Sequence, residues 1–293
     1  MSVIIEGTYR IMNRIGDGSF GSIFEGYNMN NEEKVAIKIS EMNSNILLKN
    51  EARIYNALTN IDGVPVIRSY GMTGKYSYLV MDLLGQSLEY YKEQCGGKLS
   101  LKCVLLIGIK LLERIKTIHQ SGIIHRDIKP ENILFGIDDE SKLFLIDFGL
   151  SKTYVDTRSN HIEITNENSI IGTKDFISLN IHNGLTPSRR DDLESVGYLL
   201  IYLLNGNLPW QDINIIDTDE RNKQIRDIKT MKSLWMLLDD DIPGELIIFI
   251  LYCRKLEFTQ DPDYNYLKIL LTNLYKLQGF PVDNKYDWNT DRV

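Results

Sequence analysis

The segment Gly122–Phe135, GIIHRDIKPENILF, places several ionisable side chains between two short apolar runs. Within it Asp127 is followed by Lys129 and then by Asn132. These residue types suit the transfer of a phosphoryl group to a hydroxyl. The carboxylate orients the hydroxyl and accepts its proton, the ammonium offsets charge on the moving group, and the carboxamide oxygen binds a metal ion. We therefore predict that Asp127, Lys129 and Asn132 are catalytic residues.

A further carboxylate, Asp147, stands at the end of the apolar run LFLI and is followed by Phe148 and Gly149. A carboxylate at a strand end, with a flexible glycine two residues later, is a good ligand for a hard cation. Asp147 and Asn132 are the predicted metal ligands.

Three glycines, Gly16, Gly18 and Gly21, form the pattern G-x-G-x-x-G within IGDGSFGSI. A dinucleotide-binding fold requires a helix after this pattern, whereas here a strand-like run follows. We expect a hairpin whose backbone N–H groups approach phosphate oxygens, because glycine has no Cβ in the way. An ordinary hairpin turn is the alternative.

Lys38 lies between two isoleucines in the strand-like run KVAIKIS. If it faces inward, it needs a carboxylate or a phosphate as partner, because an unpaired buried charge is costly. Glu51, on the amphipathic segment that follows, is the candidate partner. The alternative is that both side chains face solvent.

The elements that must position these residues change in type along the chain. The first third alternates strand-like runs with turns and contains one helical segment, residues 45–59. Helical patterns dominate from Leu101 onward. The first helix expected there begins at Leu101 and ends before Gly122. Four more are expected over residues 191–204, 225–238, 244–253 and 264–278. We predict an α+β fold with a small β-rich lobe, residues 1–84, and a larger helical lobe, residues 85–293.

The composition is that of an ordinary globular protein, with 43% hydrophobic and 25% charged residues. A net charge of −7 argues against non-specific binding to nucleic acid or to an anionic membrane. Three scattered cysteines, Cys95, Cys103 and Cys253, indicate free thiols in a reducing compartment. No signal peptide or membrane-spanning run is apparent, so we expect a cytoplasmic or nuclear location.

Four motifs in this order resemble the signature of eukaryotic protein kinases: GDGSFG, VAIK, HRDIKPEN and DFG. Lysine two positions after the aspartate resembles the serine/threonine kinases. The later blocks GTKDFISLN, SRRDDLESVGYLLIYLLNGNLPW and DPDYNYLKILLTNLYKLQGF, followed by YDW, are similar to the casein kinase 1 family. The resemblance covers about residues 6 to 288.

This resemblance implies a bilobal protein-kinase fold and the transfer of the γ-phosphoryl group of Mg-ATP to serine or threonine hydroxyls of proteins. Lys38 would contact the α- and β-phosphates and pair with Glu51. Asp127 would be the base, Lys129 a phosphate contact, and Asn132 with Asp147 the Mg²⁺ ligands.

The resemblance also implies a nucleotide site and supports for the catalytic loop. Met81 would be the gatekeeper, and Asp82 to Leu84 the hinge that binds adenine through its backbone. Asp192 would anchor the catalytic loop, with His125 and Arg126 as structural supports. The apolar walls around adenine would be Ile15, Ile23, Ala36, Leu134 and Ile146.

One departure from the family concerns substrate choice. Casein kinase 1 enzymes favour substrates with an acid or phosphate upstream of the target, and they bind it with an arginine shortly after the Gly-Thr pair. Asp175 falls at that place here, where a carboxylate would repel a phosphate. We expect weakened or altered recognition of phosphorylated substrates, unless Lys174 or Lys223 compensates.

The sequence also bears on how the activity is regulated and on which class of activity it is. The chain ends at Val293, close to the end of the family domain, which predicts constitutive activity. Two alternatives stay open: a pseudokinase that serves as a binding scaffold, and a kinase for small-molecule hydroxyls.

Overall fold

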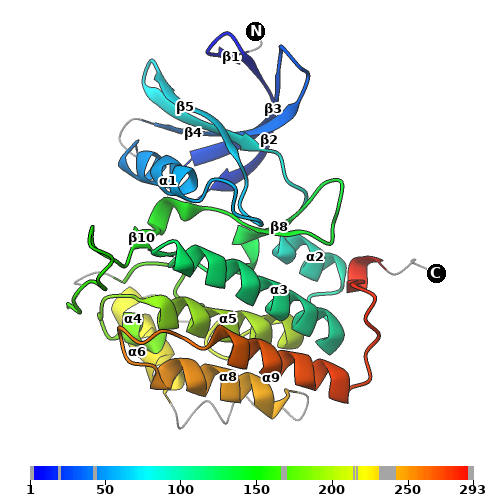
Figure 1. Cartoon of the computed structure of the whole chain (residues 1–293), viewed down its shortest axis with the longest axis vertical. Coiled ribbons are helices and arrows are strands. Elements are labelled where there is room, and N and C mark those ends of the chain that lie inside the picture. The colour runs from blue at the N-terminus through cyan, green and yellow to red at the C-terminus, as the bar shows by residue number, and fades with distance from the viewer. Residues whose placement is uncertain are drawn as a thin grey trace. The chain divides into compact units, whose positions relative to one another are not determined.

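The computed structural model describes residues 3–18, 21–41, 45–165, 170–213, 215, 217–230 and 242–289. The chain forms two compact units. The first contains Met1–Gln86 and Ile133–Ser151, and the second contains Ser87–Asn132 and Lys152–Val293. An antiparallel sheet comes first along the chain and a helical region follows, which confirms the predicted α+β kinase-type fold (Figure 1).

The first unit is built on one antiparallel sheet with the strand order β1-β2-β3-β4-β6-β5. Its strands are β1 (Ile4–Ile5), β2 (Tyr9–Gly18), β3 (Gly21–Asn28), β4 (Lys34–Glu41), β5 (Ile67–Thr73) and β6 (Tyr76–Asp82). Side chains alternate between the two faces of each strand. Val35, Ile37, Tyr78 and Val80 therefore share one face, where they form a core with residues of β1 and β2. Lys38 points to the opposite face.

One helix of the first unit packs against a segment that comes much later in the chain. Helix α1 (Asn45–Ala57) contacts the short helix η3 (Phe148–Leu150), which follows the paired strands β8 (Ile133–Phe135) and β9 (Leu143–Leu145). The rings of Tyr55 and Phe148 meet edge to face, 5.0 Å apart. Helix α1 thus supports the backbone around Asp147.

The second unit is mainly helical. Its helices are α2 (Leu88–Gln94), α3 (Leu101–Gln120), α4 (Leu179–His182), α5 (Arg189–Asn205), α6 (Thr218–Ile228), α8 (Gly244–Lys255) and α9 (Tyr264–Leu277). Helix α5 packs against α3 and α8, and α3 also packs against α9 (Figure 1). Most of α5 is buried, from Asp191 to Leu203, so this helix forms the centre of the unit. The short strands β7 (Ile123–Ile124) and β10 (Lys152–Thr153) also belong to this unit, where they pair with each other and β7 contacts α3.

The predicted long helices are largely present. Helices α5, α8 and α9 begin and end within two residues of the predicted bounds, and α3 ends just before Gly122, whose φ of 75° suits a helix stop. The helix predicted at 225–238 was wrong at its start, because α6 begins at Thr218 behind the capping side chain of Asp217. Residues 231–238 of that prediction lie outside the described part of the chain.

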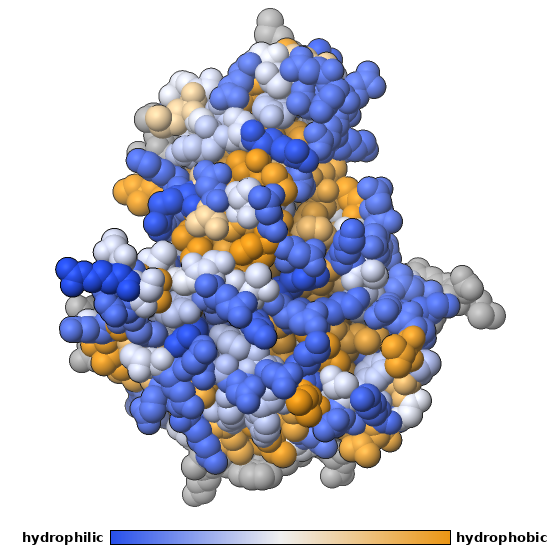
Figure 2. Space-filling view, in the orientation of Figure 1, coloured by the Kyte–Doolittle hydropathy of each residue, from blue (hydrophilic) through white to orange (hydrophobic). Residues whose placement is uncertain are grey.

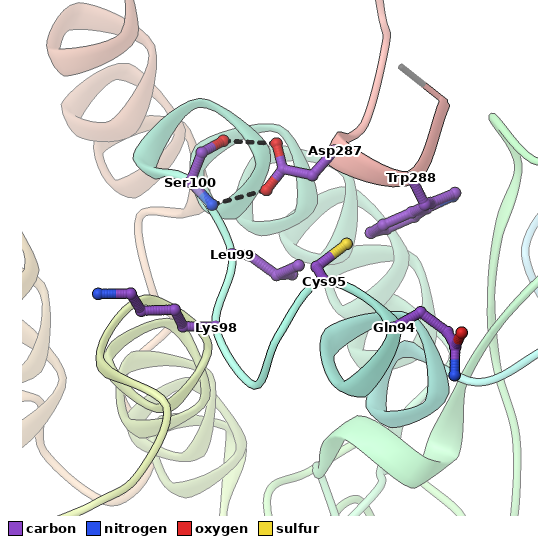
Figure 3. Close-up of a pocket in the computed structure, with 7 residues that line it drawn as sticks. All are labelled: Gln94, Cys95, Lys98, Leu99, Ser100, Asp287 and Trp288. Atoms are coloured by element: carbon purple, nitrogen blue, oxygen red, sulfur yellow. Dashed lines mark hydrogen bonds between the residues drawn. The ribbon is translucent and has the colours of Figure 1, made fainter. Parts of the chain in front are cut away.

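The YDW sequence holds the C-terminal part of the second unit in place. The Trp288 ring stacks between Tyr91, 4.3 Å away, and Tyr286, 4.6 Å away. Asp287 lies in the short helix η5 (Asp287–Asn289) and accepts hydrogen bonds from the backbone N–H and hydroxyl of Ser100, both at 2.6 Å (Figure 3). A cavity of about 450 Å³ lies beside this contact, at the start of α3, and contains no predicted site residue.

Hydrophilic side chains cover most of both units on the face shown in Figure 2. Among the helices described, none has the length and apolar character needed to cross a membrane.

Candidate active site

Lys38 lies at the centre of a buried ion-pair cluster in the first unit. The residue is 3% exposed, so its side chain faces inward and not toward solvent. Its Nζ donates to Glu51 Oε2 at 2.8 Å and to Asp147 Oδ1 at 2.9 Å. Strand β4, helix α1 and the segment before η3 each supply one member of this cluster.

The carboxylates compensate for the burial of Lys38. Burial lowers the pKa of Lys38, but the charges of Glu51 and Asp147 outweigh it, and the pKa is raised overall. Burial raises the pKa of Glu51 to about 7, and Asp147 adds to this effect while Lys38 opposes it. A cation held by two carboxylates can bind a phosphate oxygen in the same way.

The backbone around Asp147 is fixed by contacts from α1. Asp147 has a φ of 64°, in the left-handed region, and its N–H donates to the Tyr55 hydroxyl at 3.2 Å. Asn50 donates to the carbonyls of Gly149 at 3.3 Å and Ser151 at 3.1 Å. These bonds place the Asp147 carboxylate beside Lys38.

The register of three strands brings several predicted nucleotide contacts onto one face of the sheet. Ile23 lies opposite Lys38, and Ala36 lies opposite Met81. Directly paired residues point to the same side, so all four side chains share the face opposite the core of the first unit. Ala36 and Met81 are each 9% exposed, whereas Ile15 on β2 is 50% exposed.

The predicted hinge is tied to β8. Gly85 donates to the carbonyl of Phe135 at 2.7 Å, and Phe135 donates to the carbonyl of Gln86 at 3.2 Å. A side chain at Gly85 would come within 2.9 Å of the Phe135 oxygen, so the close approach requires glycine. These bonds bring Leu84 and Leu134 onto adjoining segments, and both are partly buried, as is Ile146.

Asp82, the first predicted hinge residue, is held by the neighbouring strand. Its carboxylate accepts hydrogen bonds from the Val66 N–H at 2.9 Å and from Arg68 at 3.1 Å. Its own N–H donates to the Val66 carbonyl at 3.1 Å. The end of β6 is therefore fixed before the chain reaches Leu84.

The three glycines of the G-x-G-x-x-G pattern, Gly16, Gly18 and Gly21, have different surroundings. Gly18 and Gly21 pair across the β2–β3 hairpin, and the two residues between them lie outside the described ranges. A Cβ at Gly21 would collide with the carbonyl oxygen of Ile39, so packing requires glycine there. No described atom lies within 4 Å of a Cβ built at Gly16. Packing within the described chain therefore does not explain Gly16, and a ligand that approaches the backbone would.

In the second unit, Asp127, Lys129 and Asn132 lie together. Asp127 is 4% exposed, and its Oδ2 lies 3.0 Å from Lys129 Nζ and 3.1 Å from the side-chain nitrogen of Asn132. Its Oδ1 accepts hydrogen bonds from the N–H of Thr173 at 2.9 Å and from its hydroxyl at 2.7 Å. Thr173 was missed from the sequence; the Gly-Thr pair was noted there only as a family motif.

The backbone before Asp127 is held by Asp192 of α5, as predicted. The buried Asp192 carboxylate accepts hydrogen bonds from the N–H groups of His125 at 2.7 Å and Arg126 at 2.8 Å. His119 Nε2 lies 2.9 Å from the same carboxylate. Burial works to raise the pKa of Asp192, but the contacts with His119 and His125 outweigh it and lower the pKa. These bonds also hold Arg126 at its left-handed φ of 70°.

The metal assigned to Asn132 and Asp147 fits the chemistry of these side chains. The side-chain nitrogen of Asn132 donates to the Asp127 carbonyl at 2.9 Å, so its amide oxygen is the atom that would take a cation. An amide oxygen and a carboxylate are hard ligands of the kind that Mg²⁺ prefers, with phosphate oxygens and water completing the shell. Among the described residues, no group of three His, Cys, Asp or Glu side chains is placed to hold a metal by itself.

The segment after Thr173 is anchored to the start of α5. The Ser178 hydroxyl donates to Asp191 at 2.6 Å, and the Asn180 amide donates to the same oxygen at 3.2 Å. The N–H of Leu179 donates to Glu194 at 3.2 Å. Burial raises the pKa of Asp191 to about 6. The Ser-Leu-Asn motif thus has a structural role in this chain.

Asp175 has a cationic neighbour that the sequence did not indicate. Its carboxylate lies 3.6 Å from Arg221 of α6 and accepts a hydrogen bond from Gln211 at 3.3 Å. Lys223, considered earlier as a compensating cation, is 57% exposed and pairs with Glu220 at 3.7 Å.

A family model described as protein kinase domain matches residues 9–266 of the chain.

Proposed function

Because the chain belongs to the protein kinase family, we propose that it is a serine/threonine kinase of casein kinase 1 type that uses Mg-ATP. The observation that carries this proposal is the contact of Asp127 with Lys129, Asn132 and Thr173. Lysine at position 129 and the anchored Ser178-Leu179-Asn180 motif support the finer assignment. The lobe boundary between residues 84 and 85 and constitutive activity stay predictions.

In the proposed reaction Asp127 orients the acceptor hydroxyl and takes its proton. Thr173 and Asn132 hold the Asp127 carboxylate from two sides, which limits its rotation. Lys129, beside the carboxylate, offsets charge on the transferred group. Lys38, oriented by Glu51, contacts the phosphates of the nucleotide. Mg-ATP bound here would supply the phosphoryl group, and its Mg²⁺ would neutralise charge on the phosphate oxygens.

We propose further that this kinase has a reduced preference for substrates already phosphorylated upstream of the target. The Asp175 carboxylate lies beside Arg221, so this arginine already has an anionic partner in the chain. A substrate phosphate would have to compete with that carboxylate and would be repelled by it.

The proposed activity is tested by incubating the protein with casein and ATP labelled at the γ-phosphate. We expect label in serine and threonine of the casein for the wild-type protein, and a loss of labelling in Asp127→Asn. A pseudokinase would label nothing, and a small-molecule kinase would label choline or an aminoglycoside but not casein.

A further inference from the structure

Lys229, the residue that follows α6, is a fully buried lysine with an unusual set of partners. Its side chain has 0% exposure. Its Nζ donates to the backbone carbonyls of Lys174 at 3.0 Å, Asp175 at 2.9 Å and Ile177 at 2.8 Å. An ammonium group has three N–H donors, and here three carbonyls from one short stretch of chain accept them.

The surroundings of Lys229 favour this arrangement. Burial lowers the pKa of Lys229, because a buried ammonium loses its hydration. The rings of Tyr198 and Trp210 each lie 4.7 Å from the ammonium, within cation–π range. His182 Nε2 lies 3.2 Å away, and burial together with Lys229 lowers the pKa of His182 to about 3, so this ring is neutral.

The backbone of Lys229 is held from the opposite side. Arg254 of α8 donates to the Lys229 carbonyl at 2.5 Å. The same guanidinium donates to Glu194 at 2.9 Å and to the Tyr198 hydroxyl at 2.6 Å, both on α5. Lys229 therefore connects the helical core of the second unit to residues 174–177.

These residues continue directly from Thr173, whose N–H and hydroxyl bind Asp127. We call residues 173–177 the acceptor segment. A general base must lie within about 3 Å of the hydroxyl that it deprotonates, so a peptide that reaches Asp127 must pass beside this segment. Its placement therefore affects how the acceptor peptide binds.

We propose that Lys229 is a positioning residue that fixes the acceptor segment for the binding of protein substrates. This inference rests on the proposed kinase function. Lys229 does not touch the reacting atoms; it satisfies three carbonyls that would otherwise turn toward water and displace the segment.

The test measures peptide phosphorylation by Lys229→Met, which keeps the length of the side chain and removes its donors. We expect the KM for an acceptor peptide to rise roughly tenfold, as for the loss of hydrogen bonds to a charged group, while the KM for ATP stays unchanged. Lys223→Met, at an exposed position of α6, is the control and should match the wild type.

A second variant, Trp210→Phe, provides a test that does not depend on the folding of Lys229→Met. The Trp210 indole donates to the Asp175 carbonyl at 2.9 Å, so this change removes one bond to the acceptor segment and keeps an aromatic ring beside Lys229. We expect a smaller rise in the peptide KM, again without a change in the KM for ATP.

Unchanged peptide KM values in the folded variants would overturn the proposal. A lower melting temperature together with lower kcat at unchanged KM values would also overturn it, because that is the result of a merely structural role. Wild-type protein that phosphorylates no peptide would instead refute the proposed function, so the two failures are distinguishable.

Discussion

At the scale of single residues, the main feature is how completely the Asp127 carboxylate is held. Thr173 donates to one oxygen twice, while Lys129 and Asn132 contact the other. If Asp127 is the base, as proposed, this restraint keeps the carboxylate in the orientation that proton transfer needs and avoids a loss of rotational entropy at each turnover. Thr173 deserves a test because it lies far from Asp127 in sequence.

We predict that Thr173→Val lowers kcat by about tenfold to a hundredfold, because it removes the hydroxyl donor to Asp127 and keeps the side-chain shape. Steady-state kinetics on a peptide substrate provide the measurement. Thr173→Ser retains a hydroxyl and is the matched control, with activity near that of the wild type. Equal kcat values for Thr173→Val and the wild type would show that the hydroxyl does not position the base.

The pairing of Asp175 with Arg221 also belongs to this scale. We predict that Asp175→Asn raises the rate on a peptide with an upstream phosphoserine, relative to its unphosphorylated form, by about threefold to tenfold. The reason is that Arg221 loses its internal carboxylate partner and can bind the phosphate. Ratios of kcat/KM for the two peptides provide the measurement.

Two double variants test whether Arg221 is responsible for the higher rate on the phosphorylated peptide. Adding Arg221→Gln to Asp175→Asn should remove the gain, whereas adding Arg226→Gln, at another arginine of α6, should retain it. A wild-type protein that already favours the phosphorylated peptide strongly would contradict the assignment.

At the scale of elements, strand register decides which of the predicted nucleotide contacts lie on the same face of the sheet. The pairing of β3, β4 and β6 places Ile23, Ala36, Lys38 and Met81 on one face. The glycines of the β2–β3 hairpin have different reasons to be glycine. Gly21 is required by the nearby Ile39 carbonyl, whereas Gly16 has no described neighbour that would exclude a side chain.

We predict that the two glycine-to-alanine changes affect different properties, stability for one and ATP binding for the other. Gly21→Ala should destabilise the protein by about 1–3 kcal/mol, because the new methyl group collides with backbone. Gly16→Ala should leave the melting temperature near that of the wild type and weaken ATP binding. Thermal unfolding and nucleotide titration measure both variants. A stable Gly21→Ala, or undiminished ATP affinity in Gly16→Ala, would refute the corresponding role.

Residue types and spacing predicted the contacts within short motifs. Of the contacts between distant segments, that of Asp192 with the backbone before Asp127 was expected only from the family resemblance, and that of Thr173 with Asp127 was not predicted. Asp127, Lys129 and Asn132 fall within six positions, so their residue types alone indicated the chemistry. The orientation of Lys38 was left open, because apolar residues on both sides of it fit either face of the strand. Thr173 lies 46 positions from Asp127, and no periodic pattern connects them.

The contact between Asp175 and Arg221 was not predicted from the sequence for a second reason. The predicted helix began at Ile225 and left out residues 221 and 223, whereas both lie in α6. Residues two positions apart on a helix point in nearly opposite directions. Arg221 therefore reaches Asp175 while Lys223 stays exposed, a distinction that depends on where the helix begins.

At the scale of the whole molecule, buried charges make stability depend on pH. Glu51 has a pKa of about 7 in the folded protein, above its ordinary value. A raised pKa means that the folded state holds the proton more tightly than the unfolded state. The resulting stabilisation is complete below the ordinary pKa of glutamate and is lost as pH rises through about 7.

We predict that the difference in unfolding free energy between the wild type and Glu51→Gln decreases from pH 5 to pH 8, by about 3 kcal/mol at most. Urea unfolding at several pH values measures it. Asp191 and His182 also titrate with altered pKa values, but they contribute equally to both proteins and cancel in the difference. Exposed Glu257→Gln is the control and should show no such trend. A difference that increases with pH would contradict the raised pKa.

The central claim is that Asp127 is the base of a protein kinase, and one experiment tests it most directly. Phosphate transfer from γ-labelled ATP to casein is measured for the wild type and for Asp127→Asn, with nucleotide affinity measured in parallel. We predict that the wild type labels casein, and that the variant is slower by about a hundredfold to ten-thousandfold with nearly unchanged ATP affinity. Full activity in Asp127→Asn, or no labelling by the wild type, would contradict the account.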